Sequence, residues 1–192
     1  MYKDNDLRKS YFVKYNESEA YVEYVKGGAP ADFSRTSLSA NFLFSTAEAY
    51  LNLAEATAYQ GKEDEARKAL NDLRVKRLVT EQYTNSEESG AELIELIREE
   101  RERELCLEGH RWFDLRRYGV CEKYPDSKLL THNYTYYDNG ASTQMLETHV
   151  FTLESNDAAY ILPIPQEVLD FNTGMVNNER PWRAYTVTTP KD

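Results

Sequence analysis

The densest group of chemically active side chains lies in one charged stretch, residues 99–119. Glu100 and Glu104 stand one helical turn apart, the spacing that places two carboxylates on one helix face as a possible general acid and base. The sequence marks no cleft around them, and the neighbouring arginines would hold both carboxylates ionised. We therefore expect a protein that is not an enzyme.

The same stretch predicts a buried network of ion pairs. On a helical projection its charged residues share half the circumference with the apolar ones. The apolar residues are Leu93, Ile94, Leu96, Ile97, Leu105, Leu107, Trp112 and Leu115, and the charged ones are Glu100, Arg101, Glu104, Glu108, Arg111 and Asp114. Charged side chains rarely bury unless they are paired, and a planar guanidinium can meet a carboxylate bidentately. We expect these six residues to clamp the helix to its neighbours.

A solvated charged helix is the alternative for this stretch. Arg98 and Glu102 are four residues apart, as are Glu99 and Arg103, and pairs at this spacing support each other on an exposed face. We expect those two pairs to be exposed. The other charges follow the apolar residues and are assigned to the buried network.

Length and composition narrow the class of protein. A chain of 192 residues holds one ordinary core, or the end of something larger. The net charge of −10 and pI near 4.9 argue against a nucleic-acid partner, and the mean hydropathy of −0.73 comes with no apolar run of membrane-span length. Met1-Tyr2-Lys3 does not begin a signal peptide. Because the chain starts abruptly in a strand-like segment, we expect it to be a piece from within a larger protein.

The cysteines and histidines do not form a recognisable site. Cys106 and Cys121 are spaced like neither a redox motif nor a zinc knuckle. His110, His132 and His149 are scattered without the spacing of metal ligands. We expect no metal and no cofactor.

The middle of the chain has helical periodicity. From about residue 39 small and apolar residues recur at three- and four-residue spacing until Gly61, a natural stop. Acidic residues 63–65 suit the first turn of a second helix, which finishes in the basic run 74–77. Ser89-Gly90-Ala91-Glu92 predicts a capping box for a third helix that runs to about Leu107 or Glu108. After a bend at Gly109, residues 110–118 would complete a second helix pair.

Both ends of the chain carry strand signals. Residues 7–26 predict a hairpin, and residues 133–137 and 144–153 predict a second one around Asp138-Asn139-Gly140. Apolar residues between prolines in 159–165 predict an extended strap across a hydrophobic surface, followed by a short helix over 166–171. The predicted fold class is mainly α, with tetratricopeptide-like antiparallel helix pairs, small β-hairpins and irregular loops.

The 15 tyrosines supply the candidate ligand contacts. Tyr134, Tyr136 and Tyr137 form an aromatic, uncharged stretch, and sugars stack on such rings through their apolar C–H faces. Packing of these rings down onto the helices is the interpretation that the sequence favours, and a carbohydrate contact is the alternative. In the first hairpin, cross-strand pairs are favoured over a ligand platform for Tyr11, Tyr15, Tyr21 and Tyr24.

Four segments, in order, resemble the SusD/RagB family of nutrient-binding outer-membrane lipoproteins of Bacteroidetes. They are Asp6-Leu7-Arg8 before an aromatic strand, residues 47–56, the run 98–105 continued by 108–117, and residues 160–172 with their Leu-Pro-Ile-Pro. The third segment is the most diagnostic. The sequence departs from the family at residues 177–182, where members usually carry Gln-Asn-Pro-Gly-Tyr, and before Ala47, where Ser and Thr replace Arg-Leu.

The resemblance spans almost the whole chain but only the C-terminal part of a family member. It implies a non-catalytic lipoprotein at the cell surface, in the outer membrane, that binds glycans or related nutrients. It further implies delivery of oligosaccharides to a SusC-like TonB-dependent transporter, with this chain supplying the helical scaffold. Membrane attachment would come only through a lipid anchor upstream of Met1, so Cys106 and Cys121 would not be lipid sites.

The expected domain organisation is a single C-terminal SusD/RagB-like domain over residues 1–192. Residues 1–38 would form a hairpin and loop, 39–119 the helical repeat core, and 120–192 an irregular hairpin region with the closing strap. Two other functions stay open. One is a helical-repeat adaptor that binds a peptide or protein without sugar affinity. The other is a glycoside hydrolase that uses Glu100 or Glu104.

Overall fold

The computed structural model describes residues 1–16, 21–24, 45–138 and 144–189. The chain divides into two compact units, Met1–Arg111 and Trp112–Asp192. The described residues form six α-helices, a two-stranded hairpin and a small three-stranded antiparallel sheet, so the predicted mainly α class is confirmed. None of the described helices combines the length and the apolar character that crossing a membrane requires.

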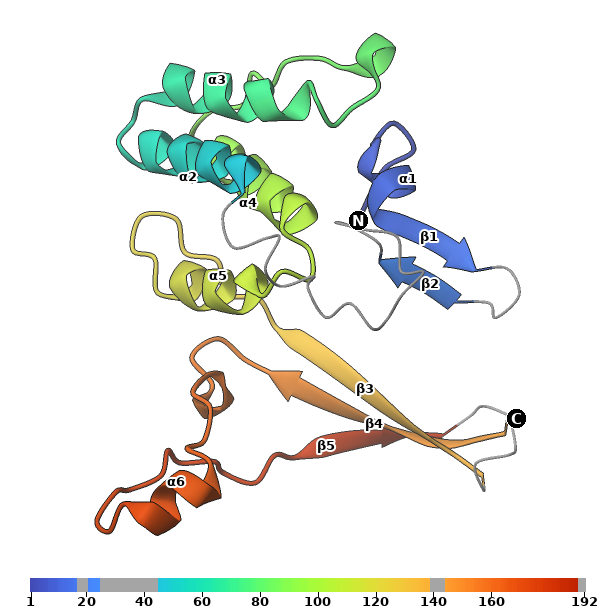
Figure 1. Cartoon of the computed structure of the whole chain (residues 1–192), viewed down its shortest axis with the longest axis vertical. Coiled ribbons are helices and arrows are strands. Elements are labelled where there is room, and N and C mark those ends of the chain that lie inside the picture. The colour runs from blue at the N-terminus through green and yellow to red at the C-terminus, as the bar shows by residue number, and fades with distance from the viewer. Residues whose placement is uncertain (17–20, 25–44, 139–143, 190–192) are drawn as a thin grey trace. The chain divides into compact units, whose positions relative to one another are not determined.

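Three helices build the core of the first unit (Figure 1). They are α2 (Thr46–Tyr59), α3 (Glu63–Arg74) and α4 (Gly90–Glu104), and α2 contacts both of the others. Gly61, at φ +78°, turns the chain between α2 and α3 as predicted. Small side chains on α2 and α3 let these helices approach closely. The buried apolar residues of the three helices are Ala47, Leu51, Ala54, Ala58, Ala66, Ala69, Leu70, Leu73, Leu93, Ile94 and Ile97.

The predicted capping box at the start of α4 is wrong. The Ser89 side chain makes no capping hydrogen bond. Instead the Gly90 amide donates to the Glu63 Oε1 at 2.9 Å. The first turn of α4 is therefore capped by a carboxylate from α3, a contact between two helices that no local pattern contains.

Several predicted helix ends also move. The predicted start near residue 39 lies outside the described residues, and the described α2 begins after Ser45, whose side chain accepts from the Ala47 amide at 3.2 Å. α3 stops at Arg74 and a short 3-10 turn (Thr80–Gln82) follows. α4 stops at Glu104, and Leu107, at φ 60° and 78% exposed, does not belong to the buried stripe. Gly109, at φ +84°, makes the expected bend before α5 (His110–Gly119).

The N-terminal hairpin is shorter than predicted. Residues 8–12 form helix α1 (Arg8–Phe12), and only then do β1 (Val13–Asn16) and β2 (Tyr21–Tyr24) pair antiparallel. The Asp6 carboxylate accepts from the Arg8 amide at 3.0 Å, which favours a helical turn over an extended strand at this point. Tyr11 therefore lies on α1, and the predicted cross-strand tyrosine contacts fall outside the described side chains.

The first unit also gathers six charges in one group, four of them buried and two half-buried, here named the six-charge cluster. Its members are the carboxylates Asp6, Glu100 and Glu104 and the guanidiniums Arg8, Arg77 and Arg103. Arg8 stands at the centre and is 2% exposed. Its Nη1 lies 2.7 Å from the Glu100 Oε1 and 2.9 Å from the Glu104 Oε2, while its Nε and Nη2 form a fork on Asp6 at 2.9 and 2.8 Å. Three negative and three positive charges balance within the cluster.

The outer arginines connect this cluster to three parts of the chain. Arg77, just beyond α3, donates from Nε and Nη2 to the two oxygens of Glu104, both at 2.9 Å. Arg103 donates to the Glu100 Oε2 at 3.0 Å. Beside them the backbone of the N-terminal segment runs along residues 77–79, with the Leu7 amide donating to the Arg77 carbonyl at 2.8 Å. The cluster therefore fastens the N-terminal segment to the ends of α3 and α4.

The second unit is built on a sheet of order β3-β4-β5 (Figure 1). Its strands are β3 (Leu130–Tyr137), β4 (Met145–Leu153) and β5 (Tyr185–Thr188), all antiparallel. The predicted second hairpin corresponds to β3 and β4 and is confirmed, whereas β5 was not predicted. Between β4 and β5 the chain forms a 3-10 turn, η3 (Ala158–Tyr160), and the helix α6 (Gln166–Phe171).

The proline-flanked strap between η3 and α6 is held by side-chain amides. Asn177 accepts from the Ile164 amide at 2.8 Å, and Asn178 donates to the Leu162 carbonyl at 2.7 Å. Ile161 and Leu162 are exposed. The prediction that the strap's apolar side chains cover a hydrophobic surface is therefore wrong for these two residues, because the contacts that hold the strap are polar.

Arg8 and Arg111 offer a matched test of the six-charge cluster. Arg8→Met leaves buried carboxylates unpaired and should lower the free energy of unfolding by about 3–5 kcal/mol. Arg111 pairs with Glu102 at 2.9 Å, but the two side chains are 33% and 35% exposed, so Arg111→Met should cost about 1 kcal/mol or less. Urea denaturation of both variants measures the difference, and equal losses would contradict the structural role of the cluster.

Candidate functional site

One face of the β3-β4-β5 sheet is covered with rings and is here named the aromatic face. Alternate residues of a strand share a face, and the register pairs Tyr134 with His149 and Phe151 with Tyr185. Trp182, just before β5, adds a ring next to Tyr185. The aromatic face consists of Tyr134, Tyr136, His149, Phe151, Tyr185 and Trp182.

The rings of the aromatic face form a continuous row. Tyr134 and Tyr136 have centroids 4.8 Å apart, and Tyr136 lies 4.7 Å from His149. His149 stacks on Tyr185 at 4.1 Å with 14° between the planes. Tyr134 is 52% exposed, Tyr136 41% and Trp182 81%. The row thus exposes aromatic surface to solvent, with Tyr134 and Tyr136 edge to face at 74°.

The same face carries one charged group that can make polar contacts. The Glu147 Oε1 lies 2.7 Å from the His149 Nε2, and Glu147 and His149 are two residues apart on β4, hence on one face. This pair orients the imidazole that stacks on Tyr185. Rings and a carboxylate–imidazole pair together suit a ligand that has both an apolar side and hydroxyl groups.

The opposite face of the sheet is chemically different. Thr135 and Thr148 face each other across β3 and β4 with hydroxyl oxygens 3.0 Å apart, and the Thr188 hydroxyl donates to the Thr148 carbonyl at 3.4 Å. Thr148 is buried. The aromatic residues therefore gather on one face because the strands alternate rings with threonines, which is a period-two pattern.

Tyr137 is the predicted candidate that stands apart from this row. It is exposed, as predicted for a ligand contact, but a register shift lies between Tyr136 and Tyr137. Such a bulge interrupts the alternation that keeps Tyr134 and Tyr136 together. The favoured interpretation, in which the three rings pack down onto the helices, is wrong, since all three are exposed.

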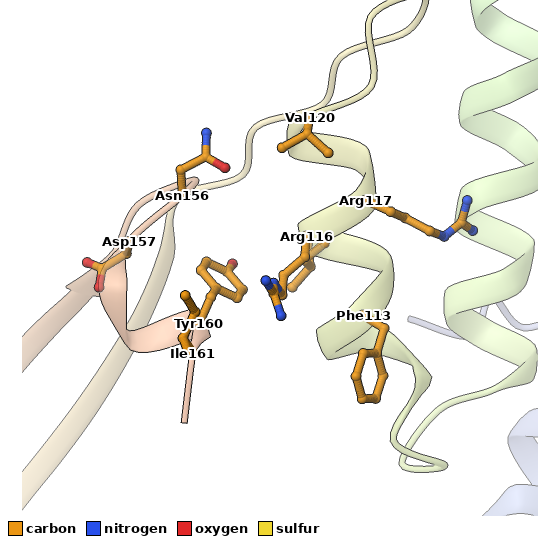
Figure 2. Close-up of a pocket in the computed structure, with 9 residues that line it drawn as sticks. Phe113, Arg116, Arg117, Val120, Asn156, Asp157, Tyr160 and Ile161 are labelled. Atoms are coloured by element: carbon orange, nitrogen blue, oxygen red, sulfur yellow. The ribbon is translucent and has the colours of Figure 1, made fainter. Parts of the chain in front are cut away.

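A second feature of this unit is a cavity of about 470 Å³ next to α5 (Figure 2). α5 and the residue that follows it supply one wall, and η3 with its neighbours supplies the other. The lining residues are Phe113, Leu115, Arg116, Arg117, Val120, Asn156, Asp157, Tyr160 and Ile161. A Cβ on Gly119 would fall 2.5 Å from the Ser155 Oγ, so the end of α5 lies close to the loop before η3.

The turn η3 is fixed by Asp157. Its Oδ1 accepts from the Ala159 amide at 2.7 Å, and its Oδ2 accepts from the Arg183 Nη1 at 2.9 Å. The hydrogen bond from Arg183 holds the pKa of the Asp157 carboxyl below its ordinary value. The turn positions Tyr160, which is buried and lies 4.6 Å from the Trp112 ring.

The residues predicted to form the ion-pair network occupy several places. Glu100 and Glu104 lie in the six-charge cluster. Arg101 is buried and donates to the Asn52 side chain at 2.9 Å. Asp114 is buried 2.9 Å from the Arg117 Nε, and Glu108 is half-buried.

Arg111 and the two predicted surface pairs lie outside the buried network or only partly at the surface. Arg111 meets Glu102 in a half-exposed pair. Of the surface pairs, Glu99–Arg103 is present at 3.3 Å, but Arg103 is half-buried and also donates to Glu100 in the six-charge cluster. The surface assignment of Arg98 is wrong, because this side chain is buried and donates to the Tyr59 hydroxyl at 2.7 Å.

Comparison with known proteins identifies the family. The SusD family model matches residues 5–182. The chain belongs to the SusD family. The family consists of carbohydrate-binding, non-catalytic proteins, so the expectation that this chain is not an enzyme is confirmed.

Among solved structures, this SusD-family chain is similar to a SusD-like carbohydrate binding protein from Bacteroides vulgatus. The sequences are 23% identical and the TM-score is 0.47. The match covers 80% of this chain and 31% of that chain, so this chain spans less than a third of that protein's length. A search of curated proteins finds no match.

The contact between Asp157 and Arg183 predicts an acid-sensitive step in this SusD-family chain. A carboxyl with a lowered pKa stabilises the fold above its ordinary pKa, and that contribution is lost as the pH falls through the lowered value. In a Trp182→Phe background Trp112 is the single tryptophan and reports on Tyr160. Its fluorescence should change with a midpoint below pH 3.8, the ordinary pKa of the group. Asp157→Asn should remove that transition, and an unchanged titration curve would contradict the assignment.

Proposed function

We propose that this chain is part of a cell-surface protein that binds glycans, and that the aromatic face is where the sugar chain lies. The observation that carries the proposal is the continuous row of exposed rings on one side of the β3-β4-β5 sheet. A sugar ring has an apolar C–H side and a rim of hydroxyls, so it can stack on Tyr134 or Tyr136 while its hydroxyls bind Glu147.

The exposure of these rings supports a binding role. A folded chain that leaves Tyr134, Tyr136 and Trp182 in water forgoes the stabilisation that burial of large rings gives. Contiguous exposed apolar surface of this kind marks a binding site. The net charge of −10 argues against nucleic acid as the bound molecule. Carbohydrate, which the family binds, is the ligand class that fits both observations.

The helical part serves in this proposal as the scaffold. α2 and α3 form a helix pair joined at Gly61, with alanines at the contact, and α4 packs on α2, which supports a tetratricopeptide-like arrangement of these helices. The single C-terminal domain would comprise the hairpin and loop of residues 1–38, the helical core of 39–119, and the sheet region with its strap of 120–192. Most charges of the six-charge cluster are turned inward, which suits a rigid support rather than a ligand site.

Family membership extends the proposal to the whole protein. The protein would be held at the outer membrane, facing outward, by a lipid on a cysteine upstream of Met1. It would pass oligosaccharides to a SusC-like TonB-dependent transporter. Support for this part comes from membership of the SusD family.

Alanine substitutions on the aromatic face test the proposal. Tyr136→Ala and Tyr185→Ala should each weaken oligosaccharide binding by about 1–2 kcal/mol, roughly fivefold to thirtyfold in Kd, because each removes a stacking ring. Tyr50→Ala is the matched control, since Tyr50 is an equally exposed tyrosine on α2. A glycan array selects the ligand and calorimetry measures the affinities. Tight binding of a peptide by a protein that binds no glycan would instead support a helical-repeat adaptor.

A further inference from the structure

We propose that the cavity next to α5 binds a sugar unit that carries a carboxylate, a uronic acid, with Arg116 as its counterion. The inference rests on the proposed glycan binding and adds a class of ligand and a second contact region. It draws on three observations: an arginine whose charge the described residues leave uncompensated, a cavity of suitable size and lining, and an acidic neighbour already neutralised by another arginine.

The charges around the cavity single out Arg116. Arg117 donates to Asp114 at 2.9 Å and to the Tyr118 hydroxyl at 3.0 Å. Asp157 is paired with Arg183 at 2.9 Å. Arg116 is exposed and makes no ion pair or hydrogen bond through its side chain within the described part of the chain. It thus leaves one positive charge at the cavity of a chain whose net charge is −10.

The arrangement of the side chains suits an acidic sugar. Arg116 points from α5 toward the ring of Tyr160, whereas Arg117 points away on the other side of the helix (Figure 2). Asn156 comes from the opposite wall and offers an amide to hydroxyl groups, whereas the neighbouring Asp157 carboxylate points away from α5 (Figure 2). Phe113, which is exposed, supplies aromatic surface for the C–H side of a sugar ring, and the buried Tyr160 closes the wall behind Arg116.

Size and geometry favour a carboxylated sugar in particular. A volume of about 470 Å³ lies within the roughly 300–1,000 Å³ typical of small-molecule sites. A planar guanidinium matches a planar carboxylate with two parallel hydrogen bonds. Because Arg183 already compensates Asp157, that carboxylate does not repel the incoming anion as an unpaired one would. The site therefore distinguishes a uronic acid from its neutral counterpart.

A matched pair of ligands tests this inference. Calorimetry compares trigalacturonate with its fully methyl-esterified form, which keeps the sugar skeleton and removes the charge. The wild-type protein should bind the acid about tenfold tighter than the ester, the gain expected of a charge-assisted hydrogen bond. Arg116→Gln should lower the affinity for the acid to that of the ester and leave the ester unchanged. Lys76→Gln removes an exposed positive charge from the end of α3 and should change neither affinity.

Two further measurements keep the result decisive. Thermal melting shows whether Arg116→Gln is folded, and in the wild-type protein the preference for the acid should shrink as salt is raised, because salt screens an exposed charge. Equal binding of acid and ester by the wild-type protein would overturn this inference and leave glycan binding intact. A preference that survives in Arg116→Gln but is lost in a Tyr134→Ala/Tyr136→Ala variant would overturn it by placing the acid on the aromatic face. Failure to bind any glycan would reject the proposed function and this inference together.

Discussion

The first unit depends on the way Arg8 is buried. A guanidinium that is 2% exposed would be strongly destabilising without partners, and here it meets three carboxylates, two of which each hold a further arginine. Each charge is within 3.0 Å of an opposite one. Because every carboxylate in the cluster has a fixed arginine partner, the N-terminal segment has one favourable register against residues 77–79. The cluster therefore determines where the N-terminal segment lies as much as it contributes to the stability of the fold.

A local sequence pattern predicted part of the six-charge cluster and missed the rest. The helical projection correctly indicated that Glu100 and Glu104 lie among buried residues, because that property depends on one helix alone. Their central partner Arg8 lies 96 residues from Glu104, and Arg77 lies 27 residues away. Helical periodicity gives the face of a helix but not the segment that packs against it. The same reason explains the cap of α4, where Glu63 of α3 replaces the local serine.

In the sheet, too, the sequence pattern of one segment does not give the segments that pair with it. Tyr134 and Tyr136 could be chosen as candidates because they are close in sequence and alternate on one strand. Tyr185 and Trp182 could not be chosen in this way, because they come near the two tyrosines of β3 only through the pairing of β5 with β4. β5 itself could have been found, since Tyr185-Thr186-Val187-Thr188 alternates and is rich in strand-forming residues, but it is only four residues long. The ligand contacts predicted from one strand were thus a part of a surface that three strands build.

The two candidate contact regions of the second unit are linked by one arginine. Arg183 lies between Trp182 and Tyr185, which belong to the aromatic face, and its guanidinium donates to Asp157 of the cavity wall and to the Thr152 carbonyl of β4. The Arg183 side chain thereby holds together the segment that leads into β5, the last residues of β4 and the turn that positions Tyr160. This places neutral stacking and acid recognition on one rigid support, so a glycan that carries both kinds of unit could engage both regions with little further ordering of the protein.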